Sequence, residues 1–510
     1  MTPREHATEL LAVLRAAVAE RSVARAPTER LVQVLGHVPA RLLPAVDVAL
    51  RDRLSDYRED GWPSWDFPEL ARFKRAPDGW AVMAVAASHR NGYVREAAVS
   101  GLAASREGRS VPYVLLRLND WVTQVREAAH QAIETFLQPE FASDVVAALP
   151  AIRALARRTR ADHEELIHRV FNFLRTPACE TAVRAGCAAP DRAIRRDCLQ
   201  IMLRPENVHA AGEAQVVFGA ALADRDPAVR LWAARELASA LPARWAEALA
   251  RRALADRSVQ VRRAALAVVA PSLSDDEVRP LFEAALLDTH TTARWQARVL
   301  VLARGPFDLA GFYRRVLGEA TQPVLVRGAL LGLGESGTTE DVARVVPFLS
   351  ADRLRVRCAA LHARADLEAL STIEPYLSAL WSLEPGLSRE ARRALEPRLG
   401  HLPVATLNTL VVDHALPPHT RRNALSLANG KSKWERLPVL LDGCADSDEV
   451  IAKMASLLVD GWCARYNRSF LQPTPAQVAL ASASYARVSR RLSARSRPEI
   501  GHILSVLGRG

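Results

Sequence analysis

The chain has 510 residues, of which 49% are hydrophobic and only 6% aromatic, and its formal net charge is +11. This length admits either several ordinary domains or one long repeat array. A core built mainly from Ala, Leu and Val favours closely packed helices over a β-sandwich, which uses more β-branched and aromatic side chains. The sequence contains no apolar run of about 18 residues, so no membrane-spanning helix is expected.

The positive charge is unevenly distributed. Residues 1–80 hold twelve basic and twelve acidic side chains, whereas the last 26 residues hold six arginines against Glu499 alone. Six irregularly spaced cysteines indicate a reducing compartment, and Met1–Leu14 has no signal-peptide layout. We therefore expect a cytoplasmic protein, and the heavy use of Arg and Ala with only four lysines is typical of a GC-rich bacterial genome.

Residues 1–80 are interpreted as an N-terminal helical cap. The spacing of apolar residues predicts helices between Thr2 and Leu54. Residues 57–80 hold six aromatic side chains and three prolines, which predicts an ordered, loop-rich insertion. Within it, Trp62, Trp65 and Phe67 have two interpretations. They fold back over the first repeat, or they are exposed as an interaction hot spot, because large aromatic side chains dominate interface energies.

A pattern of about 32 residues recurs from residue 81 to residue 465. Its anchor is an arginine, present as Arg95, Arg126, Arg195, Arg230, Arg262, Arg294, Arg327 and Arg357. The residue before the anchor is usually Val and the third residue after it is usually Ala. An aspartate stands six residues before several anchors, as Asp120, Asp224, Asp256 and Asp288. A degenerate copy fits residues 161–174, and further copies are expected near Arg389, Arg421 and Lys453. This periodicity predicts a stacked array of helix pairs.

Each conserved position of the repeat has a physical reason. The aspartate lies in the turn before the second helix, where it can accept hydrogen bonds from exposed N–H groups. The small residue lets neighbouring helices approach to about 8–10 Å. The arginine can reach an aspartate in its own turn or in the adjacent turn, which would form a ladder of ion pairs. If exposed, each pair would contribute about 0–1 kcal/mol and would set register more than stability.

The stretch Gly332-Leu333-Gly334-Glu335-Ser336-Gly337 matches the spacing of a dinucleotide-binding fingerprint. That fingerprint requires a preceding strand and a glycine turn that opens a helix. Here the glycines follow apolar residues at helical spacing, which predicts that they close a helix. Thr338 and Asp341 then predict the N-cap of the next helix.

At this point the repeat can be compared with a known family. The run from Asp224 to Arg230, followed by Ala233, resembles the turn and second helix of a HEAT repeat. Leu331–Gly337 resembles the linker between bacterial HEAT-like repeats of the PBS-lyase type. The resemblance covers roughly residues 81–460 and implies an all-α, right-handed α-solenoid of about 11–12 repeats. It implies little about function, because such repeats occur in scaffolds, adaptors, lyases and a family of DNA glycosylases.

Four short motifs were weighed as chemical sites. His163 and His168 are five residues apart, whereas a zinc-protease helix needs four, so we expect surface polar residues there. Gly430-Lys431-Ser432 lacks the rest of a phosphate loop and predicts a helix C-cap after Asn429. Asp446–Glu449 lacks the glycine of a calcium loop and fits the turn and N-cap of the repeat. Cys179, Cys187 and Cys198 lack metal-ligand spacing. We expect no metal, no cofactor and no enzymatic activity.

Residues 466–510 are interpreted as a C-terminal helical cap with a basic tail. Prolines near residue 474 predict a break, and Ala476–Val506 predicts one or two closing helices. The tail arginines form a candidate basic patch: Arg487, Arg490, Arg491, Arg495 and Arg497. A solvated final helix is the alternative interpretation.

The sequence as a whole favours a non-enzymatic scaffold that binds a protein partner along the surface of the second helices. By family analogy the partner belongs to a multi-component bacterial assembly, such as a defence or secretion system. The first alternative is a DNA-binding, DNA glycosylase-like HEAT protein. It would use a basic stripe that includes Arg196, Arg263, Arg393 and Arg422, but Glu96, Glu127 and Trp295 interrupt that stripe. The second alternative is a lyase with a pocket formed by several repeats.

Overall fold

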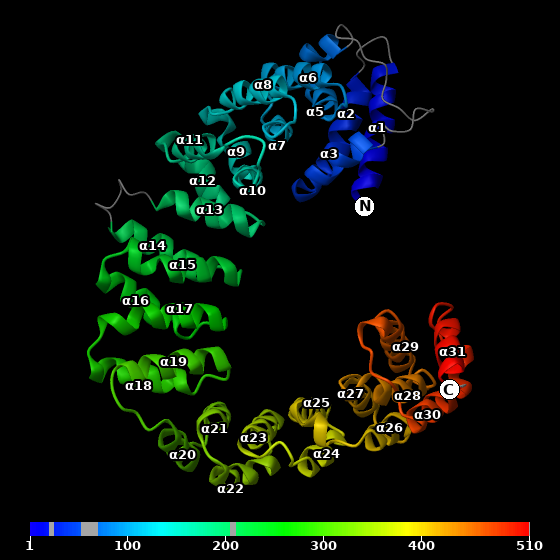
Figure 1. Ribbon diagram of the computed structural model, residues 1–510. Helices are drawn as coiled ribbons and strands as arrows, with labels where there is room; N and C mark the ends of the chain where they lie inside the picture. The colour runs from blue at the N-terminus through cyan, green and yellow to red at the C-terminus, as the bar shows by residue number, and fades with distance from the viewer. Residues whose placement is uncertain (20–24, 53–69, 204–210, 509–510) are drawn as a thin grey trace. The chain divides into compact units, whose positions relative to one another are not determined.

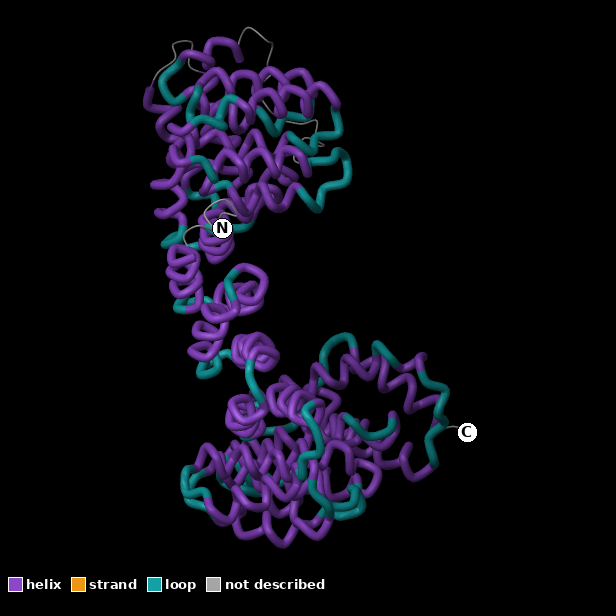
Figure 2. Tube along the Cα trace, turned by 90° about the vertical axis from the view of Figure 1, so that its left-hand side faces the viewer, coloured by secondary structure: helices purple, strands orange, loops and turns teal. Residues whose placement is uncertain are grey.

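The computed structural model describes residues 1–19, 25–52, 70–203 and 211–508. Within these ranges all regular structure is helical and no strand occurs (Figure 2). The predicted all-α class is therefore confirmed. By internal contacts the chain divides into two compact units, Met1–Ser272 and Leu273–Gly510. This boundary falls inside residues 81–465, which we predicted to be one uninterrupted repeat region.

The first unit begins with the predicted N-terminal helices and continues into helix pairs. Its α-helices are α1 (Pro3–Ala19), α2 (Arg25–Gly36), α3 (Leu43–Asp52), α5 (Gly79–Ala86), α6 (Gly92–Ser105), α7 (Val111–Arg117), α8 (Thr123–Glu134), α9 (Ala142–Ala147), α10 (Leu149–Leu155), α11 (Glu164–Leu174), α12 (Glu180–Gly186), α13 (Arg192–Met202), α14 (Ala211–Leu222), α15 (Pro227–Ala240), α16 (Ala243–Ala253) and α17 (Val259–Val269). Short 3₁₀ turns precede or follow several of them, at Ala40–Leu42, Arg72–Arg75, Gly108–Ser110, Pro139–Phe141, Pro177–Cys179 and Ala270–Ser272. The degenerate repeat copy corresponds to α11.

The second unit continues the same pattern to the C-terminus. Its α-helices are α18 (Asp275–Leu286), α19 (Thr291–Ala303), α20 (Leu309–Glu319), α21 (Pro323–Ser336), α22 (Val342–Val345), α23 (Leu354–Leu367), α24 (Glu374–Leu380), α25 (Pro385–Leu395), α26 (Val404–Val412), α27 (Pro418–Asn429), α28 (Lys433–Gly443), α29 (Glu449–Cys463), α30 (Pro475–Val488) and α31 (Ser496–Leu507). Its 3₁₀ turns are Thr339–Asp341, Val346–Ser350, Glu396–His401, Tyr466–Arg468 and Ser489–Arg491. The two closing helices and the expected copies near Arg389, Arg421 and Lys453 are present.

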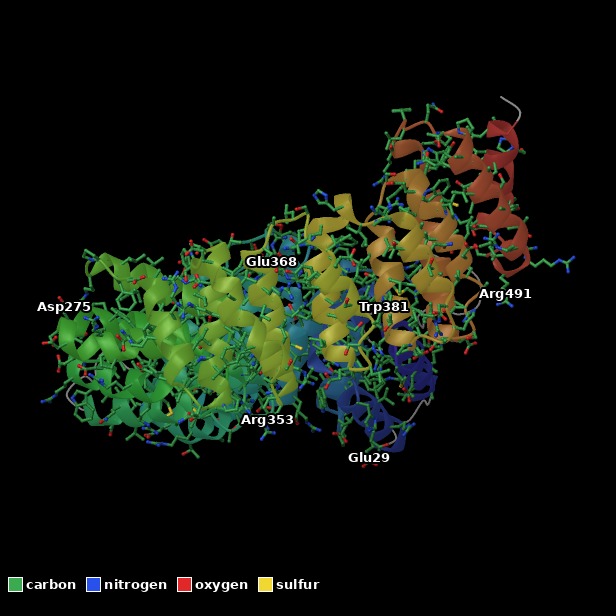
Figure 3. The ribbon with its side chains drawn as sticks, turned by 90° about the horizontal axis from the view of Figure 1, so that it is seen from below. Glu29, Asp275, Arg353, Glu368, Trp381 and Arg491 are labelled. Atoms are coloured by element: carbon green, nitrogen blue, oxygen red, sulfur yellow. The ribbon has the colours of Figure 1, made fainter. Side chains whose placement is uncertain are left out.

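Neighbouring helices pack as pairs, and each pair stacks on the next. In the second unit α20 packs against α21 and α24 against α25, while the second helices pack in series, α21 on α23 and α23 on α25. These second helices lie along one side of the unit and α20, α22 and α24 along the other (Figure 1). Arg353 and Glu368 flank α23 and lie at opposite edges of this layer (Figure 3). The described residues thus form an α-solenoid of HEAT-like helix pairs, which confirms the predicted fold class, while the number of eleven or twelve repeats stays a prediction.

The small residue after each anchor lies in the helix interface, as predicted. These side chains are fully buried at Ala98, Ala129, Cys198, Ala233, Ala265, Ala297 and Ala360. Ala98, Ala129 and Cys198 belong to an apolar core that runs through many repeats from Ala7 to Ile201, and a similar core runs from Leu361 to Leu504 in the second unit. Stability therefore comes mainly from stacking, because a single pair cannot bury its own apolar face.

The glycine motif closes a helix, as expected. Helix α21 ends at Ser336, Gly337 follows as its C-cap, and Thr338 forms a capping box with Asp341. Within the helix, a Cβ atom at Gly332 would lie 2.2 Å from the ring of Tyr313. The glycines are therefore required for close packing of α21 rather than for a nucleotide.

A search of the described helices for one long and apolar enough to cross a membrane finds none. Two smaller motifs have the structural roles that we expected. Gly430 follows the end of α27, and Asp448 caps α29 by accepting the N–H groups of Val450 and Ile451.

Candidate functional site

One arginine in several repeats joins two successive turns. Arg230 Nη1 donates to the carbonyl oxygens of Asp224 and Arg225 in its own turn, at 2.8 and 3.2 Å. Its Nε and Nη2 donate to both carboxylate oxygens of Asp256 in the next turn, at 2.7 and 3.0 Å. The same bidentate pairing recurs as Arg95–Asp120, Arg195–Asp224 and Arg421–Asp446. We call these four pairs the arginine ladder, which confirms the predicted contact with the adjacent turn.

The ladder pairs are buried rather than exposed. Arg95 is 0%, Arg421 3% and Arg230 4% exposed. Loss of one partner from a buried ion pair costs about 3–5 kcal/mol, because the other charge stays buried without compensation. The four ladder pairs are therefore not the weak, exposed ion pairs that the sequence analysis considered. They stabilise the contact between successive repeats as well as setting the register of those repeats.

The environment of the ladder keeps its carboxylates ionised. Burial by itself would raise the pKa of Asp256, but the hydrogen bonds from Arg230 and from the Ser258 N–H outweigh it and lower that pKa. The pKa of Asp446 is lowered in the same way, with burial opposed by Arg421 and the Asp448 N–H. These aspartates remain charged throughout the neutral pH range.

The ladder is interrupted in the second unit. In three successive turns the position equivalent to Asp224 and Asp256, two residues before the N-cap of the second helix, lacks a carboxylate: Ala320, Ala351 and Ser382. An arginine in the preceding repeat therefore has no aspartate to bind in the next turn. Two arginines bind other acids instead, because Arg294 Nε donates to Glu335 at 2.9 Å and Arg357 pairs with Glu384.

The register expected from the sequence is one residue out in α21 and α25, because Val326 and Ser388 occupy the anchor position and Arg327 and Arg389 follow it. Neither arginine makes a hydrogen bond or ion pair with any residue in the part of the chain that the structure describes, and the same holds for Arg355. Arg327 is half-buried, whereas Arg355 and Arg389 are exposed. Burial lowers the pKa of Arg327, and the nearby positive charge of Arg355 lowers it further.

These arginines line a groove of about 450 Å³ that runs over the N-terminal parts of α19, α21, α23 and α25. Five arginines and one glutamate contribute to its wall: Arg294, Arg327, Arg355, Arg389, Arg393 and Glu390. We call this the arginine groove. All four helices are second helices of their pairs, on the side of the unit that α21, α23 and α25 share (Figure 1).

The remaining polar groups of the groove do not form a catalytic arrangement. Glu390 pairs with His362 at 2.7 Å and with Arg393 at 3.2 Å. The hydrogen bond to Glu390 raises the pKa of His362. Burial raises the pKa of the Cys358 thiol, which disfavours the nucleophilic thiolate. A search of the described residues finds no group of three or more metal-ligating side chains.

An apolar stripe lies on α19, whose N-terminal part lines the groove. Trp295, Val299 and Leu302 are 58%, 47% and 49% exposed. Their spacing of four and three residues places them on one face of the helix. Trp295 directly follows Arg294, which lines the groove. Such a contiguous row of large exposed apolar side chains is typical of an interaction surface.

The first unit has a smaller cavity of about 330 Å³ between α3, α7 and α10. Trp121 lies at its edge and is 60% exposed. The guanidinium groups of Arg51 and Arg95 lie 5.7 and 5.4 Å from the centre of its ring. Trp121 occupies the turn position that is Arg225 and Arg257 in later repeats, where those arginines bind the preceding turn. The cavity is a second, smaller candidate contact.

The residues that the sequence singled out as partner contacts lie elsewhere. Trp62, Trp65 and Phe67 fall outside the described residues, although Phe73 and Trp80 from the same aromatic segment are buried in the core. Among the tail arginines, three side chains are bound within the unit: Arg487 to Asp442, Arg491 to the Ala445 carbonyl and Arg497 to the Ser489 carbonyl. Arg490 and Arg495 are exposed. Arg491 lies at the C-terminal end of the second unit (Figure 3).

Two other sequence interpretations are corrected by the structure. His163 is not a surface residue, because it is 3% exposed and its ring stacks on His130 with the centroids 6.0 Å apart. The suggested basic stripe is compensated at Arg196, which pairs with Asp197 at 2.9 Å, and at Arg393, which pairs with Glu390. A uniformly basic track is therefore absent at these two described positions.

The sequence analysis did not bring Arg327, Arg355 and Arg389 together. A signal was nevertheless present, because Leu330 stands where the other repeats have a small residue, and the fully buried Ala329 before it shows that Arg327 is one residue out of register.

No protein-family model matches the chain, and no curated protein matches it. Among solved structures, it is similar to importin beta, with 12% identity over 98% of this chain and 72% of that chain and a TM-score of 0.35. The karyopherin Kap121p, bound to the extreme C-terminus of the protein phosphatase Cdc14p, gives 12% identity, 99% and 62% coverage and a TM-score of 0.34. The S. pombe condensin Cnd3–Cnd2 subcomplex gives 12%, 98% and 86%, with a TM-score of 0.36. Likeness at this level says nothing about the function of this chain.

Proposed function

We propose that the protein is a non-enzymatic scaffold that binds a protein partner along the second helices of its C-terminal unit. The observation that carries this proposal is the exposed stripe of Trp295, Val299 and Leu302 on α19. Exposure of three large apolar side chains on one helix face is unfavourable in water, and a partner that covers them removes this cost. Tryptophan is also the residue type that most often carries interface energy.

The partner belongs, in this proposal, to a multi-component bacterial assembly in the cytoplasm, such as a defence or secretion system. The analogy with other HEAT-like scaffolds suggests this setting. Trp62, Trp65 and Phe67, together with the five tail arginines from Arg487 to Arg497, are proposed as additional contacts. A DNA glycosylase-like activity is not favoured, because the arginine groove includes Glu390 and is lined in part by α19, which carries an apolar stripe.

The test is quantitative affinity purification from the native host. The wild type is compared with Trp295→Ser/Val299→Ser/Leu302→Ser, which removes the stripe without touching the buried core. The matched control is Val450→Ser/Leu457→Ser on α29, where both side chains are more than 60% exposed. We expect the stripe variant to lose proteins that wild type and control retain. Retention of every wild-type partner by the stripe variant would refute the proposed surface.

The additional contacts need their own variants in the same experiment. Trp62→Ala/Trp65→Ala/Phe67→Ala and a deletion of residues 487–497 are compared with wild type. Because Arg487 and Arg491 bind other parts of the unit, the deletion is accompanied by Arg490→Gln/Arg495→Gln, which changes only exposed side chains. If none of these variants loses a partner, the additional contacts are ruled out while the α19 stripe remains.

A further inference from the structure

The proposed function leaves open what kind of partner segment the scaffold holds. We propose that the arginine groove binds an acidic, partly apolar peptide segment of the partner, with carboxylates on Arg327, Arg355 and Arg389 and apolar side chains on the α19 stripe. This inference rests on the proposed function and specifies the chemistry of its ligand. It concerns a groove of about 450 Å³ that the sequence analysis did not identify.

Three arginines of the groove carry positive charge that no acidic side chain among the described residues compensates. Arginines at the anchor position, such as Arg195 and Arg230, each bind both oxygens of an aspartate. Arg327 and Arg389 lie one residue after the anchor position of their helices, which Val326 and Ser388 occupy, and neither has an acid partner among the described residues. A guanidinium group offers two parallel N–H donors to a carboxylate, and such charge-assisted pairs are among the strongest hydrogen bonds in proteins.

Arg327 and Arg355 repel each other within the groove. Arg355 and Arg327 are close enough for the charge of one to lower the pKa of the other, in addition to the effect of burial. Glu390, the single acid of the wall, is already engaged by His362 and Arg393. A ligand carboxylate would relieve the repulsion, so the groove is better suited to an anion than to a neutral ligand.

The apolar residues near the arginines favour a peptide over a nucleic acid as the ligand. A phosphate backbone needs like charge along its whole length. Here the arginines are followed by Trp295, Val299 and Leu302 on α19. At the α25 end lie Trp381 and Leu383, which are 52% and 82% exposed (Trp381 is labelled in Figure 3). Apolar residues at both ends of a basic centre match a peptide with acidic residues between apolar ones.

The dimensions of the groove also fit a peptide. It crosses four successive second helices, and at about 9–10 Å between neighbouring axes this is a path of roughly 30 Å. An extended chain covers that distance with about nine residues at about 3.3 Å each. A short linear segment is therefore long enough to reach from the α19 stripe to Leu383.

The experiment uses the full chain and a fluorescein-labelled peptide of about twelve residues in which Glu and Leu alternate. Fluorescence anisotropy compares wild type with Arg327→Gln/Arg355→Gln/Arg389→Gln. The matched control, Arg315→Gln/Arg465→Gln/Arg468→Gln, removes the same charge from three exposed arginines of the same unit. We expect the groove variant to bind roughly tenfold more weakly or worse, because charge-assisted hydrogen bonds are lost, and the control to bind within about twofold of wild type.

Two competing probes identify the ligand class. A peptide with Gln in place of Glu tests the need for carboxylates, and a labelled single-stranded oligonucleotide tests phosphate recognition. The proposal predicts weak binding of both relative to the acidic peptide. Equal binding of the Gln peptide would overturn the role of charge, and tighter, groove-dependent binding of the oligonucleotide would identify a nucleic-acid site instead.

A charge exchange guards against a variant that fails to fold. Arg355→Glu/Arg389→Glu should lose binding of the acidic peptide and gain binding of a peptide in which Lys and Leu alternate, an outcome that an unfolded variant cannot produce.

The scaffold proposal and the peptide proposal can be refuted independently. If the stripe variant loses its native partner but the acidic peptide ignores the groove arginines, the scaffold function stands and this inference is wrong. If the stripe variant retains every native partner but binding of the acidic peptide requires the groove arginines, the proposed α19 contact is wrong and peptide binding by the arginine groove is supported.

Discussion

The repeat around Arg230 and the repeat around Arg327 differ in the residue at the anchor position. Arg230 occupies that position, is 4% exposed and is bound to Asp256 across the next turn. In α21 the anchor position is the buried Val326, and Arg327, one residue later, is half-buried, unpaired within the described residues and beside Arg355. The turn after α21 carries Ala351 in place of the aspartate, so this repeat lacks both partners of the ladder. In a repeat protein, a binding site can arise where the repeat is incomplete.

The largest expected effect comes from breaking a ladder pair. Arg230→Ala should lower the local stability of α15 and α17 by about 3–5 kcal/mol, because Asp256 is left buried without its partner. Arg327→Ala should change the stability of α21 and α23 by less than about 0.5 kcal/mol, since no carboxylate depends on it. Hydrogen–deuterium exchange of the amides in these helices measures both. Equal losses in the two variants would contradict the distinction between paired and unpaired repeats.

A second effect concerns Gly328, which is buried on α21. A Cβ atom there would lie 2.0 Å from the backbone oxygen of Leu287. Gly328→Ala should therefore destabilise the second unit by about 2–4 kcal/mol, because a backbone contact of this kind can be relieved only by moving a helix. Thermal unfolding monitored by circular dichroism tests this. The control is Gly318→Ala, since a Cβ at that residue meets nothing within 4 Å.

A third prediction uses pH to separate the ladder from other contacts. The pKa of Asp256 is held below its ordinary value of 3.8. Its stabilising effect is therefore complete above that value and is lost as the pH falls through the lowered pKa of the folded state. In Arg230→Ala, burial is opposed only by the Ser258 N–H and the charge of Arg257, so Asp256 takes up its proton at higher pH than in the wild type. The difference in stability between wild type and variant should narrow as the pH falls below about 4. If the difference in stability between wild type and Arg230→Ala is the same at neutral and acidic pH, the loss of stability does not come from the Arg230–Asp256 ion pair.

The smallest effect on stability is expected at the α19 stripe. Trp295→Ser should change the melting temperature little, since surface substitutions generally alter stability by less than about 0.5 kcal/mol. Partner capture should nevertheless decrease. A large loss of stability in differential scanning calorimetry would show that Trp295 supports the fold and would remove it as a candidate contact.

The sequence by itself determined the helical class, the repeat register outside α21 and α25, and most helix ends. These features depend on local chemistry: apolar spacing forms the helix faces, Asp448 and Thr338 cap helices, and Ala233 or Ala265 allows close stacking. The contact of the anchor arginine with the next turn also followed from the repeat, because each copy places the same groups at the same separation.

Only the tertiary structure decided which arginines are satisfied and which are free. Arg294 and Arg357 lost their turn aspartates but found Glu335 and Glu384, which no spacing rule connects to them. Arg327, Arg355 and Arg389 come from three repeats and have no common motif, so their shared groove depends on how α21, α23 and α25 stack. The physical reason is that burial and charge compensation are properties of neighbours in space. A periodic sequence specifies those neighbours only where the period is unbroken.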